Sequence, residues 1–182
     1  MATTTYVALL RGVNLGGRSR VSMGALRQLV EDVGHDEVET YLQSGNVVFR
    51  AGGSTGAAAL ARELEERIER DLGVATAVLL RSAGDIAGVV RANPFTGRQD
   101  DPRKLHVTFL AGEPAADRAG GLATPVGQPD ELALAGREVY LHCPNGYGRT
   151  KLNNAYLERR LGVPATTRNW KTVTALHEMA GG

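Results

Sequence analysis

Three short segments gather glycine, asparagine, arginine and hydroxyl side chains, the residue types that could bind or transform a polar ligand. The first reads Arg-Gly-Val-Asn-Leu-Gly-Gly-Arg over residues 11–18. It follows a short apolar run and precedes a helical pattern, the place where α/β proteins hold phosphate groups with backbone N–H groups. It is neither G-x-G-x-x-G nor a Walker sequence, because no Gly-Lys-Ser/Thr ends it. The alternative interpretation is a loop whose glycines supply positive φ angles.

The second segment is Gln43-Ser44-Gly45-Asn46, between two strand patterns. A hairpin turn is the stronger interpretation of this segment. Ser44 lacks the G-x-S-x-G context of a hydrolase nucleophile. A catalytic serine also needs a neighbouring base, and the sequence identifies none.

The third segment reads Asn-Gly-Tyr-Gly-Arg-Thr-Lys over residues 145–151 and precedes a helical pattern that Thr150 could cap. Arg149 and Lys151 would then lie at a helix N-terminus, where cations oppose the helix dipole. A bound phosphate or carboxylate would relieve that conflict, so the segment is a candidate anion site. The alternative is that both cations point to solvent or pair with distant acids.

A related stretch, residues 166–172, reads Thr-Thr-Arg-Asn-Trp-Lys-Thr. Trp170 beside two cations could stack on a base or ring. A place in the hydrophobic core is the favoured interpretation for a lone tryptophan.

Two histidines are candidates for general acid/base chemistry. Alternation along two predicted strands places His106 and Thr108 on one face, and Tyr140 and His142 on one face of the other strand. We expect these four to share the sheet face that no helix covers. The aromatic signature of RNA-recognition domains is absent, and two histidines fall short of a metal ligand set. No metal site is expected.

An enzyme remains an alternative, with His106 and His142 as acid and base and with Arg149 and Lys151 as electrostatic stabilisers. No nucleophile–base pair is visible in the sequence. Cys143 is the single cysteine, which excludes an internal disulfide. A reactive thiol needs a lowered pKa that nothing in the sequence guarantees.

The elements that position these segments follow an order that repeats. Apolar periodicity, caps and turn residues predict β-α-β-β-α-β, the ferredoxin-like arrangement, in each half of the chain. In the first half we expect strands at 5–11, 38–42, 46–50 and 75–80, a helix between Ser22 and Gly34, and a helix at 57–72 closed by Gly73. In the second half we expect strands at 105–110, 131–134, 138–143 and 165–168, helices at 114–122 and 152–161, and a closing helix at 170–179.

The predicted fold is therefore α+β, with two tandem ferredoxin-like halves and a C-terminal helix. The expected boundaries are 1–81 for the first half, 82–104 for a linking helix that starts at Ser82 and its loop, and 105–182 for the second half.

Composition fits an ordered globular protein of 182 residues, with 42% hydrophobic and 23% charged residues. No stretch has the length of a membrane span or the pattern of a signal peptide, so we expect a cytoplasmic protein without a membrane partner. The net charge of +1 hides an asymmetry, since the first 30 residues hold four arginines and no acid, and residues 137–171 carry a net charge of +5. Such regions can mark an anion or nucleic-acid face.

Several strings in the chain resemble a widespread bacterial family of proteins of unknown function, the domain-of-unknown-function family 1697. They are ALLRGVNLGG at 8–17, YLQSGNVVF at 41–49, NPF at 93–95, HVTFL at 106–110, GYGRTKLNN at 146–154 and TTRNWKTV at 166–173. Leu15 and Thr150 depart mildly from the expected Val and Ser. The resemblance implies a small soluble α+β protein with two similar halves, and it implies no established activity, cofactor or catalytic residue.

The leading hypothesis is an anion-binding protein, with a phosphorylated metabolite or nucleotide held by the Gly12 loop and the 146–151 loop. The alternatives are a nucleic-acid-binding protein, which the low aromatic content of 5% opposes, the enzyme described above, and an interaction module. No oligomeric state follows from the sequence. The candidate ligand-binding residues are Arg11, Gly12, Asn14, Gly16, Gly17, Gln43, Ser44, Asn46, Gly148, Arg149, Lys151, Asn154, Arg168, Asn169 and Trp170.

Overall fold

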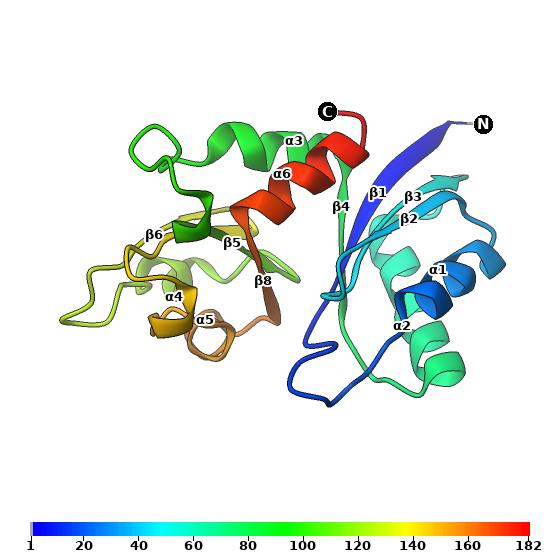
Figure 1. Ribbon diagram of the computed structural model, residues 1–182, viewed down its shortest axis with the longest axis horizontal. Coiled ribbons are helices and arrows are strands. Elements are labelled where there is room, and N and C mark those ends of the chain that lie inside the picture. Colours follow the sequence, from blue (N-terminus) through cyan, green and yellow to red (C-terminus); the bar gives the residue numbers. More distant parts are fainter. Residues whose placement is uncertain (1) are drawn as a thin grey trace. The chain divides into compact units, whose positions relative to one another are not determined.

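A computed structural model describes residues 2–182, which form two compact units. Unit 1 comprises the chain up to Gly88 together with Leu176–Gly182, and unit 2 is Val89–Ala175. Each unit is built on a four-stranded antiparallel sheet (Figure 1). The predicted α+β class and the two similar halves are confirmed. Within residues 2–182, no helix has both the length and the apolar character that crossing a membrane requires.

Unit 1 has its first strand at the centre of the sheet, in the strand order β2-β3-β1-β4. Ser22 caps α1 by accepting a hydrogen bond from the Ala25 N–H. Gly73 ends α2 in the left-handed conformation. The elements are β1 (Thr3–Leu10), α1 (Met23–Asp32), β2 (Asp36–Tyr41), β3 (Asn46–Gly52), α2 (Ala57–Leu72), β4 (Val78–Ser82) and α3 (Ala83–Ala92), whose last residues belong to unit 2.

Unit 2 repeats this design with the strand order β6-β7-β5-β8. Asn153 caps α5, and Gly162 ends that helix in the left-handed conformation. The elements are a 3-10 turn (Pro102–Lys104), β5 (Leu105–Leu110), α4 (Ala116–Gly120), β6 (Glu131–Ala135), β7 (Glu138–His142), a second 3-10 turn (Tyr147–Arg149), α5 (Asn154–Leu161), β8 (Ala165–Asn169) and α6 (Trp170–Met179), whose end belongs to unit 1.

The two sheets correspond residue by residue. In unit 1, Val7 of β1 lies opposite Arg81 of β4, and in unit 2, Val107 of β5 lies opposite Arg168 of β8. All four residues are buried. The Nη1 nitrogen of each arginine donates to the carbonyl of the preceding residue at 3.0 Å. The halves are therefore similar in register as well as in element order.

The helices after the last strands also correspond. The Ser82 hydroxyl accepts from the Asp85 N–H, and the Asp85 carboxylate accepts from the Ser82 N–H, which closes the first turn of α3. Asn169 accepts from the Thr172 N–H at the start of α6. Each half thus continues past its fourth strand into a capped helix.

A hydrophobic core lies under the helices of each sheet. In unit 1, α1 and α2 contribute Leu26 and Leu64 to a core that includes Leu10 and Phe49 of the sheet. The smaller core of unit 2 consists of Leu110, Val139, Leu141, Cys143, Leu152, Leu157, Leu161 and Ala165.

Several element bounds needed correction. The first strand is Thr3–Leu10 rather than 5–11, and α4 is Ala116–Gly120 rather than 114–122. The fourth strand begins at Val78 rather than at 75.

Helix α5 begins at Asn154 rather than at 152, and its cap is Asn153, which accepts from the Tyr156 N–H at 2.9 Å. The Thr150 hydroxyl accepts from the Leu152 N–H ahead of the helix and donates to the Asp130 carboxylate at 2.7 Å.

The prediction that His106, Thr108, Tyr140 and His142 share one sheet face is wrong. The register pairs His106 with Leu141 and places His142 opposite Leu105. Directly opposed residues of an antiparallel pair point to the same side, so the two histidines lie on opposite faces. His106 and Thr108 lie on the face of the core under α5, since Leu110 follows them in alternation.

Candidate functional site

Asn14 fixes the loop between β1 and α1. Its backbone has a φ of +57°, a conformation that asparagine tolerates better than most residues. The Asn14 Nδ2 donates to the carbonyls of Val21 and Gln43 at 2.9 and 2.6 Å, and its Oδ1 accepts from the Val21 N–H at 2.8 Å. The side chain clamps the loop to the start of α1 and to the β2–β3 turn.

The tip of this loop is a tight turn through two glycines. The Arg18 N–H donates to the Leu15 carbonyl at 3.1 Å, and the Asn14 N–H donates to the Ser19 carbonyl at 3.0 Å. Gly16 and Gly17 have φ angles of +58° and +78°, as the central residues of a type I′ turn require. The glycines therefore serve the turn, and the turn exposes Arg18.

The predicted hairpin turn at 43–46 is confirmed, and it lies against the first loop. The Leu10 N–H donates to the Gly45 carbonyl at 2.9 Å. A Cβ atom on Gly45 would lie 2.6 Å from the Val13 side chain and 2.8 Å from that of Leu10. The Asn46 Nδ2 donates to the Tyr41 carbonyl and to the Ser44 hydroxyl. The structure thus brings the first two candidate segments together within unit 1.

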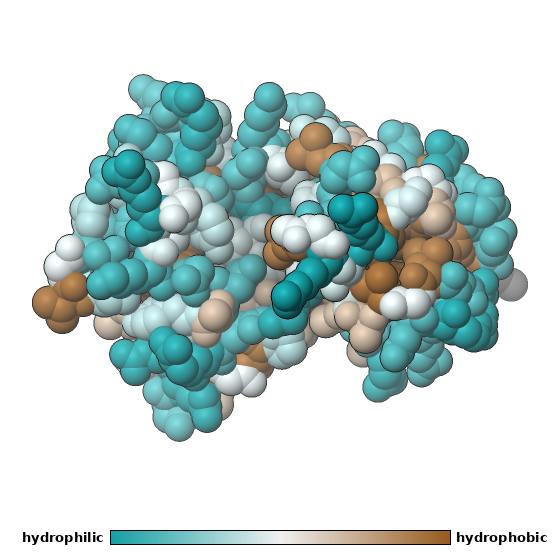
Figure 2. All heavy atoms as spheres, turned by 60° about the horizontal axis from the view of Figure 1, so that its bottom comes forward, coloured by the Kyte–Doolittle hydropathy of each residue, from teal (hydrophilic) through white to brown (hydrophobic). Residues whose placement is uncertain are grey.

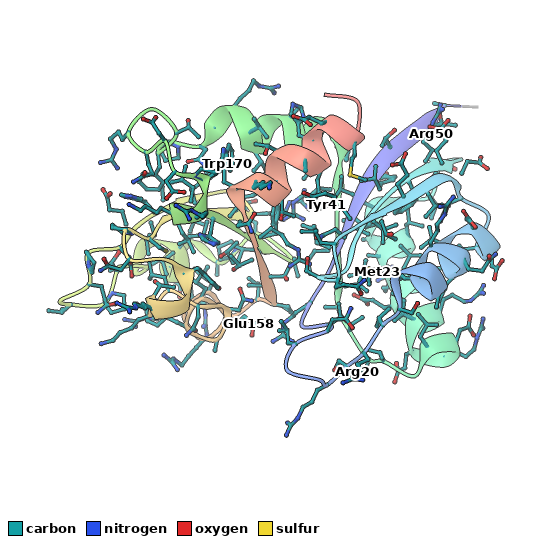
Figure 3. All side chains as sticks on the ribbon, in the orientation of Figure 1. Arg20, Met23, Tyr41, Arg50, Glu158 and Trp170 are labelled. Atoms are coloured by element: carbon teal, nitrogen blue, oxygen red, sulfur yellow. The ribbon has the colours of Figure 1, made fainter. Side chains whose placement is uncertain are left out.

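A pocket of about 500 Å³ opens where these segments meet, and its size is typical of small-molecule sites. Among the residues described, Arg20 is the only charged residue that lines the pocket. It lies on the segment that leads into α1, whose first residue is Met23 (Figure 3). The first turn of α1 contains no acidic residue. The pocket is lined by Asn14, Gly17, Arg20, Val21, Ser22 and Gln43.

Arg11, a predicted site residue, does not line this pocket. It lines a second hollow of about 460 Å³ together with Glu65, Glu66 and Glu69 of α2. Three carboxylates make that hollow unsuitable for an anion. The backbone carbonyl of Arg11 accepts from the Thr76 hydroxyl at 2.7 Å.

In unit 2, Arg149 and Lys151 are exposed. Because α5 begins at Asn154 with Asn153 as its cap, both cations precede the helix. The predicted helix started at 152, directly after Lys151; the observed start at Asn154 leaves both cations further from the helix N-terminus, so the conflict with the helix dipole is weaker than the sequence suggested.

Unit 2 instead contains a polar cluster under α5. The ring of Tyr147 stacks on His106 with centroids 4.7 Å apart. The Thr167 hydroxyl donates to the Asn154 Oδ1 at 2.6 Å and lies 2.7 Å from the Thr108 hydroxyl. Tyr147 hydrogen-bonds to Thr167 and to the backbone of Asn154. Five polar groups from four elements are thus joined at one end of the core.

His106 is buried in this cluster, and its environment changes its pKa. The residue is only 7% exposed, and its Nδ1 is buried without a hydrogen-bond partner in residues 2–182. Burial lowers the pKa of His106 to about 4. Burial raises the pKa of Tyr147, against hydrogen bonds that lower it. Both rings are therefore neutral at neutral pH.

Sequence reasoning did not select Tyr147 and Thr167. One signal was available for Tyr147, an aromatic residue between Gly146 and Gly148 in a polar loop. Thr167 lies in the candidate stretch 166–172, but its residue type did not distinguish it there, because its importance comes from its register opposite Thr108.

The remaining predicted residues have structural contacts. Arg168 donates to the Thr166 hydroxyl at 2.6 Å, and burial lowers its pKa to about 10. Asn169 caps α6. Trp170 is half-buried at the start of that helix (Figure 3). Their role toward a ligand stays a prediction.

His142 is held by partners on both ring nitrogens. Its Nδ1 lies 2.8 Å from the Glu131 carboxylate, its Nε2 lies 3.2 Å from Gln99, and its ring packs on Phe95. The hydrogen bond from His142, followed by one from Arg98, lowers the pKa of Glu131. His142 fastens the loop before β5 to the sheet, and it forms no acid–base pair with His106.

Cys143 is fully buried, and burial raises its thiol pKa to about 11. Its sulfur is therefore a protonated core atom at neutral pH. Across residues 2–182, no group of three or more His, Cys, Asp and Glu side chains could hold a metal ion.

These features define an α+β protein with two similar halves and a cation-lined pocket in unit 1. The chain belongs to the family described as "Protein of unknown function (DUF1697)", whose profile matches residues 3–140. The 146–154 and 166–173 strings lie beyond that match. The chain is similar to the structure of the conserved bacterial protein SP0830 from Streptococcus pneumoniae, at 25% identity and a TM-score of 0.76 over 98% of this chain and 99% of that one. A comparison with curated proteins gives no match.

Proposed function

We propose that this protein binds a phosphorylated metabolite or a nucleotide in the pocket of unit 1. The observation that carries the proposal is a pocket of about 500 Å³ whose only charged lining residue, within residues 2–182, is Arg20. Arginine suits phosphate, because its planar guanidinium donates two parallel hydrogen bonds.

The surroundings of the pocket support an anion further. Ser22 places the N-terminus of α1 at the pocket, and the helix dipole favours negative charge there. Gly17 leaves its backbone open to close approach. Arg18 is exposed on the same loop.

The candidate residues of unit 2 remain part of the proposal as a second anion-binding surface. Arg149 and Lys151 are exposed, and Gly148 lies between Tyr147 and Arg149 in the same turn. We also propose that each half is ferredoxin-like, with the boundaries 1–81, 82–104 and 105–182. The element order and the strand order of each sheet support this assignment.

The test is a titration of the protein with phosphate, sulfate, sugar phosphates and nucleotides, followed by thermal unfolding and calorimetry. A ligand at a hundred times its Kd should stabilise the fold by about 2.7 kcal/mol. Arg20→Ala should weaken that ligand at least about tenfold, as expected for the loss of a charged hydrogen bond.

Arg27→Ala is the matched control. Arg27 lies on α1, pairs with Glu31 at 2.9 Å and does not line the pocket. The variant makes the same change in net charge and should bind as the wild type does. Equal binding by both variants would contradict the proposal.

Nucleic acid is a second candidate ligand, favoured by three exposed arginines, Arg11, Arg18 and Arg20, within ten residues. Binding to phosphodiester backbones should fall steeply with salt. A short RNA that binds equally well at 50 and 200 mM salt would speak against this candidate.

A further inference from the structure

We infer that β6, an edge strand of the sheet in unit 2, pairs with β6 of a second copy of this chain across a twofold axis. The surface involves neither the pocket of unit 1 nor its ligand. An edge strand presents N–H and C=O groups without a neighbouring strand, and native proteins block such edges in recognisable ways. The edge strands are β2 and β4 in unit 1 and β6 and β8 in unit 2 (Figure 1).

Side chains of the same unit block the edges of β4 and β8. In β4, the Val78 N–H donates to the Glu65 carboxylate at 2.8 Å. In β8, the Ala165 N–H donates to the Glu158 carboxylate at 2.9 Å. The buried arginine of each strand also donates to the carbonyl of the residue before it. Backbone groups on both edges therefore have partners within their own unit.

The edge of β2 is protected by charge and by an irregularity. Asp36, Glu37 and Glu39 lie along its six residues, and the register with β3 shifts between Asp36 and Glu39. Charged side chains and bulges both oppose the addition of another strand. A second copy paired at β2 would also bring like charges together.

The edge of β6 has none of these devices. Its sequence is Glu-Leu-Ala-Leu-Ala, without proline or lysine. Its register with β7 is continuous over all five residues. An apolar edge of this kind is a template for a further strand.

The hydrogen-bond pattern shows which residues of β6 face outward. Successive residues of a strand direct their backbone groups to opposite sides. The Arg137 carbonyl accepts from the Leu110 N–H of β5, so the even-numbered residues of β7 bond to β6, and their partners are its first, third and fifth residues. Leu132 and Leu134 therefore direct their N–H and C=O groups away from β7. Within residues 2–182 these groups have no hydrogen-bond partner.

A second copy fits this edge because β6 is self-complementary. An antiparallel pair centred on Ala133 places Leu132 opposite Leu134 of the second copy, so that each exchanges both backbone hydrogen bonds with the other. Glu131 then lies opposite Ala135, and no like charges are opposed. A strand that pairs with itself in this way forms the isologous contact of a closed dimer.

Backbone hydrogen bonds would carry most of this contact. The side chains of Leu132 and Leu134 already pack against the core of unit 2. The face of unit 2 around α4 and α5, which Figure 2 brings forward, is mostly hydrophilic. The contact is small, so we expect a weak dimer with a dissociation constant in the micromolar range or above.

Sedimentation velocity of the full chain from about 5 to about 500 μM tests the inference, since small interfaces associate in this range. We expect a monomer–dimer equilibrium. Ala133→Lys should weaken the dimer at least about tenfold, because the axis brings the two introduced lysines face to face. Lysine is common on the edge strands of monomers, so the fold should tolerate it. Ala135→Lys is the matched control, since its lysine would face Glu131 of the second copy and should leave the dimer intact.

A mixture of two variants locates the axis. Ala133→Glu should weaken the dimer as Ala133→Lys does, because like charges again face one another. An equimolar mixture of the two variants should recover dimers, since opposite charges then meet at the axis. Thermal unfolding of each variant alone checks that the fold is retained.

Three results would overturn the inference. The first is a wild type that stays monomeric over the whole concentration range. The second is a dimer that both Ala133 variants keep at full strength. The third is a mixture of the two variants that stays as monomeric as each variant alone.

Discussion

The two halves of this protein share one strand register but differ in where their polar residues lie, in a loop of unit 1 and on the core face of the sheet in unit 2. In unit 1 the helix-covered face of the sheet is apolar, and the polar residues lie outside it in the loop after β1. In unit 2 the loop after β5 is short, and polar residues occupy the core face instead. The corresponding positions hold Tyr6, Ala8 and Leu80 in unit 1, and His106, Thr108 and Thr167 in unit 2.

The two core faces therefore differ in what their stability requires. An apolar layer needs only volume, whereas buried hydroxyl and imidazole groups need partners, and an unmet one destabilises the fold. The Nδ1 of His106 is such an unmet group in the described chain. Polar residues inside a hydrophobic core occur most often at functional sites. The polar cluster of unit 2 should therefore be tested by mutation as well as the pocket of unit 1.

The largest expected difference concerns the hairpin turns. Gly45 and Gly136 occupy corresponding turns with φ angles of +78° and +59°. A Cβ on Gly45 would strike Val13 and Leu10, whereas one on Gly136 meets nothing within 4 Å. Gly45→Ala should cost about 3–4 kcal/mol and Gly136→Ala about 1 kcal/mol. Urea unfolding of both variants measures this, and equal losses would show that the turn of unit 1 is not tightly packed.

The next effect concerns the clamp. Asn14→Ala removes three hydrogen bonds and leaves a β-carbon at positive φ, so it should cost about 3 kcal/mol. Asn14→Gly loses the same bonds without the strain and should cost about 2 kcal/mol. Thermal unfolding ranks the two variants. A loop that tolerates both without loss of stability would contradict the clamp.

A third effect concerns pH. The pKa of His106 is about 4 in the folded protein and about 6.5 in an unfolded chain. The unfolded state then binds more protons between these values, so stability is complete above pH 6.5 and falls as the pH drops. The loss between pH 7 and pH 5 should be about 2 kcal/mol.

The matched variant is His106→Phe, which keeps an aromatic ring against Tyr147 and removes the titration. Unfolding of both proteins at pH 7 and pH 5 isolates the contribution of His106. If the wild type and the variant lose the same stability, His106 is not the group responsible.

The smallest effect comes from making unit 2 resemble unit 1. Thr167→Val leaves Asn154 and Thr108 without their shared partner and should cost about 1–2 kcal/mol. Replacing both members of the pair by the unit 1 residues, Thr108→Ala with Thr167→Leu, should recover part of that loss, because the Thr108 hydroxyl is then no longer left without its Thr167 partner. A double variant much less stable than Thr167→Val would show that the hydroxyl network stabilises the fold beyond providing hydrogen-bond partners for its own members.

Local features of the sequence predicted the elements that depend on local physics. The bounds of α2 at 57–72 and of α6 at 170–179 agree with the structure, because helix formers and a closing glycine act within a few residues. The start of α5 was misplaced, because Thr150 and Asn153 are both acceptable caps. In the structure Asn153 accepts from the Tyr156 N–H of the helix, whereas Thr150 accepts from the Leu152 N–H ahead of it.

Which sheet face a residue occupies, and which residues meet at the candidate site, depends on how the strands pair. The sequence of a single strand does not reveal that pairing. Alternation along β7 separates Tyr140 from Leu141, but both are large and mostly apolar, so neither is marked as facing the core under α5. Asn14 and Asn46 were selected as ligand-binding residues because of their type. The same amide groups serve equally well as clamps, and only the tertiary contacts show which groups they hold.

The closed loop of unit 1 has a consequence for amide exchange. The N–H groups of Asn14, Arg18 and Val21 are all hydrogen-bonded within a segment that is largely exposed. These three amides should exchange with deuterium slowly, although amides of an exposed loop usually exchange rapidly. A ligand would meet a surface already ordered, so association need not wait for the loop to fold and can approach the rate of diffusional encounter.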